Sequence, residues 1–212
     1  FSLEEVADLF RSRELSGIQA QMGLQEAGIQ REIVRQINLL KRIRQSQAML
    51  EDAVNSVGQY RIEERPGIYR MNTQKNYTLC SKEELKLIEE WAGKTPFVYS
   101  CAVFYEEEIR KGETGFDFGM GLNEEYARFL EVEETDQVQY YPPCLCVHTC
   151  LPSRSGQYLS LNSLKDSLDY LKSNGLELQG DIVTQVVCMT KPGDEYFNWH
   201  IVWLPIKRPW SE

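Results

Sequence analysis

The stretch REIVRQINLLKRIRQSQAMLEDAV, residues 31–54, predicts one long helix with a single apolar stripe. It contains no Gly or Pro, the residues that weaken or break a helix. Its apolar residues fit a heptad frame in which two glutamines interrupt the seam. The a positions are Ile33, Leu40, Gln47 and Val54, and the d positions are Gln36, Ile43, Leu50 and Val57.

A seam this narrow needs a partner helix. Polar residues in a seam weaken the pairing but fix its register and its partner, which suits two copies of the same chain. We therefore predict a dimerisation coiled-coil helix over residues 27–57 and a homodimer. The predicted contact residues are Ile33, Gln36, Leu40, Ile43, Gln47, Leu50 and Val54. The alternative is a helix of a globular core, because Val34, Ile37 and Leu39 widen the stripe.

Length and composition are those of an ordinary globular protein. The 212 residues allow one domain of roughly 150 residues plus an extra element. No apolar run approaches the roughly 18 residues that would cross a membrane. The six cysteines lie mostly in apolar, strand-like runs, which predicts reduced thiols in a cytoplasmic protein.

The net charge of -9 belongs mainly to the part after Gln59. Residues 1–59 hold seven of the 23 Lys and Arg and eight of the 32 Asp and Glu, which leaves 16 basic against 24 acidic residues. This balance argues against nucleic-acid binding by the C-terminal part.

After Gly58 the sequence reads as two similar halves, each a strand, a helix and two further strands. The first half runs through QYRIEERPGIYRM (59–71), EELKLIEEWAG (83–93), PFVYSCAVFY (96–105) and FDFGMGL (116–122). The second runs through QYYPPCLCVHTCL (139–151), LNSLKDSLDYLKSNG (161–175), DIVTQVVCM (181–189) and YFNWHIVWLPI (196–206). A duplicated unit of this kind covers its own apolar faces and encloses a shared cleft. The predicted fold class is α+β, a long helix followed by a duplicated β-α-β-β antiparallel-sheet domain over residues 59–208.

FSLEEVADLF (1–10), the Gln-interrupted seam, RPGIYRM (65–71), GFDFGMG (115–121) and HIVWLPI (200–206) resemble a MerR-type transcription regulator with a GyrI-like effector-binding domain. The order of these elements, rather than any one motif, carries the resemblance. It implies that residues 1–26 are remnant helices beside a DNA-binding module that is mostly absent here, and that the long helix is an antiparallel coiled coil.

The multidrug-sensing members of that family are the nearest in layout. Membership implies a bulky lipophilic ligand, expected to be a cation. It also implies contact with promoter DNA and RNA polymerase through the absent module, and activation of a promoter by reshaping its DNA. We also predict no enzyme activity, no cofactor, no metal and no membrane contact. The alternative is a stand-alone GyrI-like binder or hydrolase, if Phe1 lies near the natural start.

The resemblance also places a ligand site. Gln185 and Ile201 stand where the drug-sensing relatives carry glutamates, so strong selectivity for cations and hydrolase activity are both in doubt. Strand alternation predicts that Val187 and Met189 share the face of Gln185. Overlaying the halves adds residues from the first half, and the resemblance adds a ring from the last strand. The predicted ligand contacts are Ser100, Ala102, Phe104, Gln185, Val187, Met189 and Trp199, whereas Trp203 is expected in the core or at an edge.

A rival site is CLCVHTC, in which Cys144, Cys146, His148 and Cys150 alternate onto one face. Thiolates with an imidazole suit zinc or copper(I). However, side chains two residues apart on a flat strand lie about 6.6 Å apart, whereas two thiolates on one zinc lie about 3.8 Å apart. We therefore expect core residues, and keep a metal or thiol sensor as the alternative.

Overall fold

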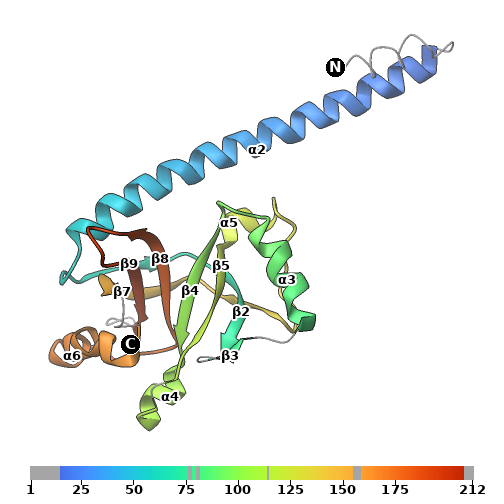
Figure 1. Cartoon of the computed structure of the whole chain (residues 1–212). Coiled ribbons are helices and arrows are strands. Elements are labelled where there is room, and N and C mark those ends of the chain that lie inside the picture. Colours follow the sequence, from blue (N-terminus) through green and yellow to red (C-terminus); the bar gives the residue numbers. More distant parts are fainter. Residues whose placement is uncertain (1–14, 76–77, 80–81, 114, 155–158, 208–212) are drawn as a thin grey trace. The chain divides into compact units, whose positions relative to one another are not determined.

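The computed structural model describes residues 15–75, 78–79, 82–113, 115–154 and 159–207 (Figure 1). The first predicted helix, over FSLEEVADLF, lies outside these residues. The chain divides into two compact units, residues 1–43 and residues 44–212. None of the helices in the described ranges combines the length and the apolarity that a membrane-spanning segment needs.

The long helix, α2, spans Leu15–Asn55 without a break. Its predicted start at residue 27 is therefore wrong, and residues 15–26, expected to be separate remnant helices, form its first turns. Gly23 and Gly28 lie inside the helix, where glycine is unfavourable. However, one glycine inside a helix costs only about 1 kcal/mol, which the rest of a 41-residue helix easily offsets. The helix ends at Asn55, two residues before the predicted end at Val57.

The rest of the chain forms one antiparallel sheet with helices packed against it, which confirms the predicted α+β class. The strands are β1 (Arg61–Arg65), β2 (Ile68–Lys75), β3 (Thr78–Leu79), β4 (Val98–Phe104), β5 (Asp117–Asn123), β6 (Val138–Tyr141), β7 (Cys144–Arg154), β8 (Ile182–Thr190) and β9 (Phe197–Pro205). The helices are α3 (Lys82–Ala92), α4 (Glu106–Lys111), α5 (Glu124–Ala127), the 3-10 turn η1 (Leu161–Leu164) and α6 (Lys165–Ser173).

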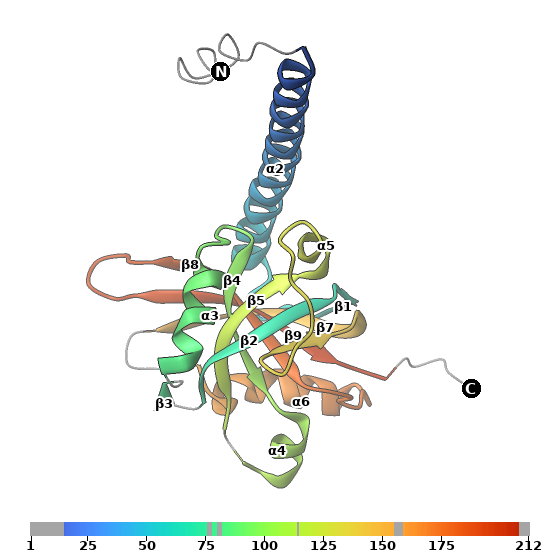
Figure 2. The ribbon, with the colours of Figure 1, turned by 90° about the vertical axis from the view of Figure 1, so that its right-hand side faces the viewer.

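The predicted duplication appears in the strand order β1-β7-β9-β8-β4-β5-β2-β3, with β6 also paired to β2. This order is symmetric about the β4–β8 pair, where β5 and then β2 on one side correspond to β9 and then β7 on the other. The strand that precedes each half pairs with the opposite half, since β1 pairs with β7 and β6 pairs with β2. Figure 2 shows β1 and β2 following one another, with β7 beside β1 and β5 beside β2.

Because β1 and β6 each pair with the opposite half, an exchange of strands between the halves, two of the predicted strands were wrong. QYRIEERPGIYRM and QYYPPCLCVHTCL were each expected to form one strand, but each forms two, separated at Pro66-Gly67 and at Pro142-Pro143. Proline has no N–H and disfavours the continuation of a sheet ladder. At each break the chain therefore leaves one half and pairs with the other.

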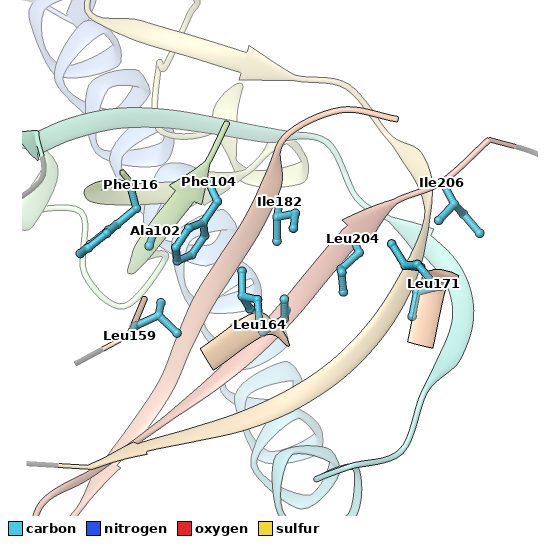
Figure 3. Close-up of a cluster of buried hydrophobic side chains, with 11 residues drawn as sticks. Ala102, Phe104, Phe116, Leu159, Leu164, Leu171, Ile182, Leu204 and Ile206 are labelled. Carbon is cyan, nitrogen blue, oxygen red and sulfur yellow. The ribbon is translucent and has the colours of Figure 1, made fainter. Parts of the chain in front are cut away.

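The main apolar core lies between the second half of the sheet and the η1–α6 segment. Figure 3 shows side chains of β4, β8 and β9 meeting those of η1 and α6. Phe104, Ile182 and Leu204 come from three strands, and Leu164 and Leu171 come from η1 and α6. The apolar stripe of LNSLKDSLDYLKSNG faces the sheet, and the segment ends at Gly175, whose φ of 65° suits a glycine.

Leu164→Ala is expected to lower the free energy of unfolding by about 2 to 5 kcal/mol, because it leaves a cavity at a fully buried position. Urea unfolding followed by tryptophan fluorescence measures this loss. The matched control is Leu85→Ala on α3, where the leucine is exposed, and its expected effect is within about 0.5 kcal/mol. Equal losses in the two variants would contradict this placement of the core.

Because His200 is buried, we expect the free energy of unfolding to decrease in mild acid. Its Nε2 lies 2.9 Å from Ser153 Oγ, and burial lowers its pKa from 6.5 to about 4. The unfolded chain therefore binds the proton more readily than the folded chain. The contribution of His200 to the free energy of unfolding is complete above pH 6.5 and is lost as the pH falls to about 4, by up to about 3 kcal/mol.

Urea unfolding at several pH values between 4 and 7 measures this slope. In His200→Gln the slope should decrease and keep the part that other groups contribute, among them the buried His148. An unchanged slope in that variant would show that His200 is not buried in its neutral form.

Candidate functional site

A cavity of about 270 Å³ lies where the two halves of the sheet meet the C-terminal part of α2. All of its lining residues belong to the unit 44–212. α2 contributes three of them, and the others come from the β1–β2 junction, the end of β5, β8 and β9. The lining consists of Gln45, Ala48, Met49, Pro66, Ile68, Asn123, Gln185, Ile201 and Trp203.

Strand register explains why these side chains share one face. Gln185 on β8 lies opposite Ile201 on β9, and Val183 lies opposite Trp203 two residues away. Directly paired residues point to the same side of a sheet, and so do residues two apart. Ile201 and Gln185, the two positions where the relatives would carry glutamates, therefore lie side by side in the wall of the cavity.

The cavity is lined by apolar groups and uncharged amides. The carboxamide of Gln45 donates to Glu125 Oε1 at 2.7 Å and accepts from the Tyr126 hydroxyl at 2.7 Å. Asn123 Oδ1 accepts from the Tyr99 hydroxyl at 2.9 Å. Gln185 Nε2 lies 3.8 Å from Met49 Sδ, a weak contact that a better acceptor would replace. The arrangement suits a small apolar molecule with one or two hydrogen-bonding groups.

A charged network lies behind the Trp203 wall. The His148 ring meets the Trp203 ring edge-on, with centroids 4.6 Å apart. Its Nε2 lies 3.6 Å from Asp52 Oδ2 and 3.8 Å from Glu63 Oε1. Burial lowers the pKa of His148, although the two carboxylates oppose this shift. Because Asp52 belongs to the last turns of α2, the network joins the cavity wall to the end of that helix.

Arg61 completes this network by two hydrogen bonds of 2.5 Å to Asp52 and one of 2.9 Å to Glu63. The hydrogen bond from Arg61 holds the pKa of Asp52 below its usual value, against the effect of burial. The end of α2 is therefore attached to β1 by a bidentate ion pair, the geometry in which arginine binds a carboxylate most strongly.

Three of the predicted ligand residues, Ser100, Ala102 and Phe104, do not line the cavity. Cys101, not Ser100 or Ala102, lies opposite Gln185, so the overlay of the two halves was wrong by one residue. Ala102 and Phe104 consequently face the main core, and Ser100 is exposed. A shift of one residue moves every side chain of a strand to the other face, and the sequence contains nothing that fixes this register.

A bulge in β8 explains why Val187 and Met189 do not line the cavity, and Trp199 lies beyond it. The pairing shifts between Val186 and Cys188, so Val187 is the extra residue and alternation fails beyond it. Met189 is 64% exposed and does not line the cavity. Trp199 shares the face of Ile201 but lies beyond the cavity, where its Nε1 donates to Thr190 Oγ1.

The sequence analysis missed Met49, Ile68 and Trp203. Trp203 was expected in the core or at an edge, yet it lies two residues from Ile201 on the same strand and hence on the same face. Alternation along β9 could have indicated it. Nothing in the sequence indicates that α2 covers the cavity.

The cysteine strand differs from its expected geometry. Cys144 Sγ and Cys146 Sγ lie 3.5 Å apart, so the expectation that a strand holds them about 6.6 Å apart is wrong for the sulfur atoms. The side chains lean toward each other although their backbones do not. His148 turns to Asp52 and Glu63 instead, and no group of three or more His, Cys, Asp or Glu suited to a metal occurs among the described residues.

The residues of the predicted coiled-coil seam of α2 are exposed to solvent along the helix. Its five apolar members, Ile33, Leu40, Ile43, Leu50 and Val54, are 41–65% exposed. The d positions continue backwards at seven-residue steps through Ile29, Met22 and Leu15, which are also exposed. Gln36 and Gln47 are exposed too, and Gln36 donates to Glu32. An apolar stripe of this length on a single helix is an unsatisfied surface.

A second, open hollow of about 640 Å³ lies between α3 and residues 131–138. Its rim carries Glu90, Glu131, Glu133 and Asp136 above an apolar floor formed by Trp91 and its neighbours. It is larger, but it belongs to one half only and lacks buried polar groups that could orient a ligand. The cavity beneath α2 is therefore the better candidate site.

Comparison with models of protein families gave no match, and comparison with curated proteins gave none either. Among solved structures, the chain is similar to the crystal structure of the EcmrR C-terminal domain, at 15% identity and a TM-score of 0.45, over 71% of this chain and 98% of that one. It is similar to the cryo-EM structure of the EcmrR-DNA complex in EcmrR-RPo, at 14% identity and a TM-score of 0.46, over 98% of this chain and 78% of that one. A hydrolase encoded by lin2189 from Listeria innocua gives 10% identity and a TM-score of 0.45, over 72% and 93%. Likenesses at this level assign the chain to no family.

Proposed function

We propose that this chain is the effector-binding and dimerisation part of a cytoplasmic MerR-type transcription regulator that senses a small lipophilic compound. The position of the cavity carries the proposal. A ligand there contacts Gln45 and Met49 of α2 on one side and both halves of the sheet on the other. Such a ligand changes the packing of the end of α2. A sensor needs this differential contact, because a ligand shifts a conformational equilibrium only through it.

The lining favours an apolar ligand over a strongly bound cation. The Trp203 ring offers a cation about 0.5 to 2 kcal/mol, and the amide oxygens offer their dipoles. Full neutralisation would need a carboxylate, and the lining contains none. We therefore infer that neutral and cationic lipophilic compounds bind with similar affinity. The same lining favours binding over hydrolysis, which requires a positioned titratable group.

The DNA and polymerase contacts of the proposed regulator come from the resemblance alone. They would be made by the module that precedes the FSLEEV segment in that family, and the homodimer would place two such modules on one promoter. The exposed seam of α2 supports the dimer, because pairing with a second copy would cover the stripe from Leu15 to Val54.

Ligand binding can be tested by tryptophan fluorescence with a tetraphenylphosphonium cation and a neutral isostere of similar size. We expect both to quench the Trp203 emission, and Trp203→Phe to abolish the response. Gln185→Glu should bind the cation about tenfold more tightly, about 1.4 kcal/mol, and leave the neutral compound unimproved, provided that the new carboxylate stays ionised.

The matched control is Gln179→Glu, the same change at an exposed position outside the cavity. It should leave both affinities unchanged. A response that survives in Trp203→Phe, or an equal gain in the two glutamate variants, would place the ligand elsewhere.

Dimerisation can be tested by light scattering after gel filtration. We expect the mass of a dimer for the parent chain and of a monomer for the double variant Leu40→Glu/Ile43→Glu, because charges at a and d positions cannot be buried in a coiled coil. Asn38→Glu, at position f on the opposite face, should remain dimeric. A monomeric parent chain would refute the proposed role of α2.

A further inference from the structure

Arg65 is a buried cation that pairs with no carboxylate among the residues the structure describes. It is 2% exposed, and its Nη2 donates to the carbonyl oxygen of Pro142 at 2.9 Å. Its Nε and Nη1 are buried and find no hydrogen-bond partner among the described residues. The ring of Tyr141 lies beneath it at 5.8 Å from the centroid. A buried charge left unpaired is costly, so an anion beside Arg65 would be strongly favoured.

Burial raises the pKa of the Tyr141 hydroxyl, so the neighbours of Arg65 that become anionic more readily are the thiols at the start of β7. Arg65 lies directly opposite Cys144 in the β1–β7 pairing, so both side chains point to the same face. Cys144 is half-buried, whereas Cys146 is fully buried, and their sulfur atoms lie 3.5 Å apart. One accessible sulfur is thus placed between a cation and a second sulfur.

These neighbours decide which sulfur ionises. The hydrogen bond from Cys146 and the charge of Arg65 lower the pKa of Cys144, against burial and the exposed carboxylate of Glu64. The same hydrogen bond raises the pKa of Cys146, together with burial. The proton therefore stays on Cys146. The thiolate is the reactive form of cysteine, and a neighbouring cation favours it.

We propose that Cys144 and Cys146 form an oxidisable pair, in which the Cys144 thiolate attacks a hydroperoxide and Cys146 then closes a disulfide. In the first step the Cys144 sulfur bonds to the terminal oxygen, the O–O bond breaks, and an alkoxide or hydroxide leaves and takes up a proton. In the second step the Cys146 sulfur attacks the Cys144 sulfenic acid, an S–S bond forms, and water leaves. The two sulfurs together lose two electrons, and the peroxide gains them.

The local backbone permits this closure. Residues two apart on a strand have Cα atoms about 6.6 Å apart, near the upper end of the range of about 4.4 to 6.8 Å found for disulfides. Cys144 is the first residue of β7 and follows Pro142-Pro143, and its pairing with β9 begins only at Cys146. Leu145 O still accepts from Ile206 N at 2.9 Å, so only Cys144 itself, which has no partner on β9, can shift as the sulfurs approach to about 2.05 Å.

The full chain, reduced and then treated with hydrogen peroxide, tests the pair. Mass mapping of the peptides should show a disulfide between Cys144 and Cys146 and unmodified Cys188. Cys188 is a control within the same chain, because it is also half-buried and burial raises its pKa. Cys150→Ser should keep the disulfide and Cys144→Ser should abolish it. A disulfide that persists in Cys144→Ser, or oxidation of Cys188 at the same rate as Cys144, would overturn the proposal.

Variants at Cys146 and at Arg65 separate the roles of these two neighbours of Cys144. In Cys146→Ser the sulfenic acid of Cys144 has no resolving thiol, so dimedone should trap it there. Arg65→Gln should slow iodoacetamide alkylation of Cys144 about tenfold near neutral pH, as expected for a rise of about one pKa unit, and Arg65→Lys should restore much of the rate. Cys146→Ser does not remove a buried charge. It therefore still tests the proposal if Arg65→Gln fails to fold.

The competing explanation is that Cys144 and Cys146 bind a metal ion. Zinc added before peroxide should leave the oxidation rate of Cys144 unchanged, because no third ligand lies beside the pair among the described residues. Protection of Cys144 by zinc that a chelator reverses would replace the oxidisable pair with a metal site.

Discussion

The antiparallel pairing of β4 with β8 joins the two halves of the sheet, and its register decides which side chains face the cavity. Val103 lies opposite Val183, and Cys101 lies opposite Gln185. With this register, Ala102, Phe104 and Ile182 face α6 and form the core, while Val103, Val183 and Gln185 face the other side. One sheet thus has an apolar face that supplies stability and a mixed face that is available for binding. Packing of the first face fixes the position of every group on the second.

The elements that the sequence analysis located correctly are those whose signals are local. The heptad pattern located α2, and the repeated strand-helix-strand-strand order located the duplicated sheet. Gln185 was placed by the resemblance, not by a local signal, and it lies in the cavity wall. Alternation fails at the bulge beside Val187, and the overlay of the halves fails by one residue at Cys101. Register between distant strands depends on packing of the whole sheet, and a single sequence contains no trace of it.

Proline has a different role here from the one its sequence context suggested. Pro66-Gly67 and Pro142-Pro143 look like local turns or bulges, yet each marks the point where the chain passes from one half to the other. Because each half holds a strand that leads into the other, neither half can separate without breaking a ladder in both. This exchange also brings Pro66 and Ile68 to the cavity and brings β1 beneath the end of α2, where Arg61 binds Asp52.

The exchanged strands place the ends of β1 and β6 at equivalent positions, and there the two halves have diverged. Arg65 ends β1 just before Pro66, and Tyr141 ends β6 just before Pro142. Exact duplication would have put two like side chains in contact near the centre of the domain. Two arginines would repel each other in a medium of low dielectric, and two tyrosines would leave the facing thiols without a cation.

The observed pair of Arg65 and Tyr141 instead places a cation over a ring, 5.8 Å from its centroid. That contact offsets only part of the cost of burying Arg65, since a cation–π contact supplies at most about 2 kcal/mol and leaves two N–H groups unpaired. The remaining cost favours ionisation of the Cys144 thiol, whose pKa the charge of Arg65 lowers.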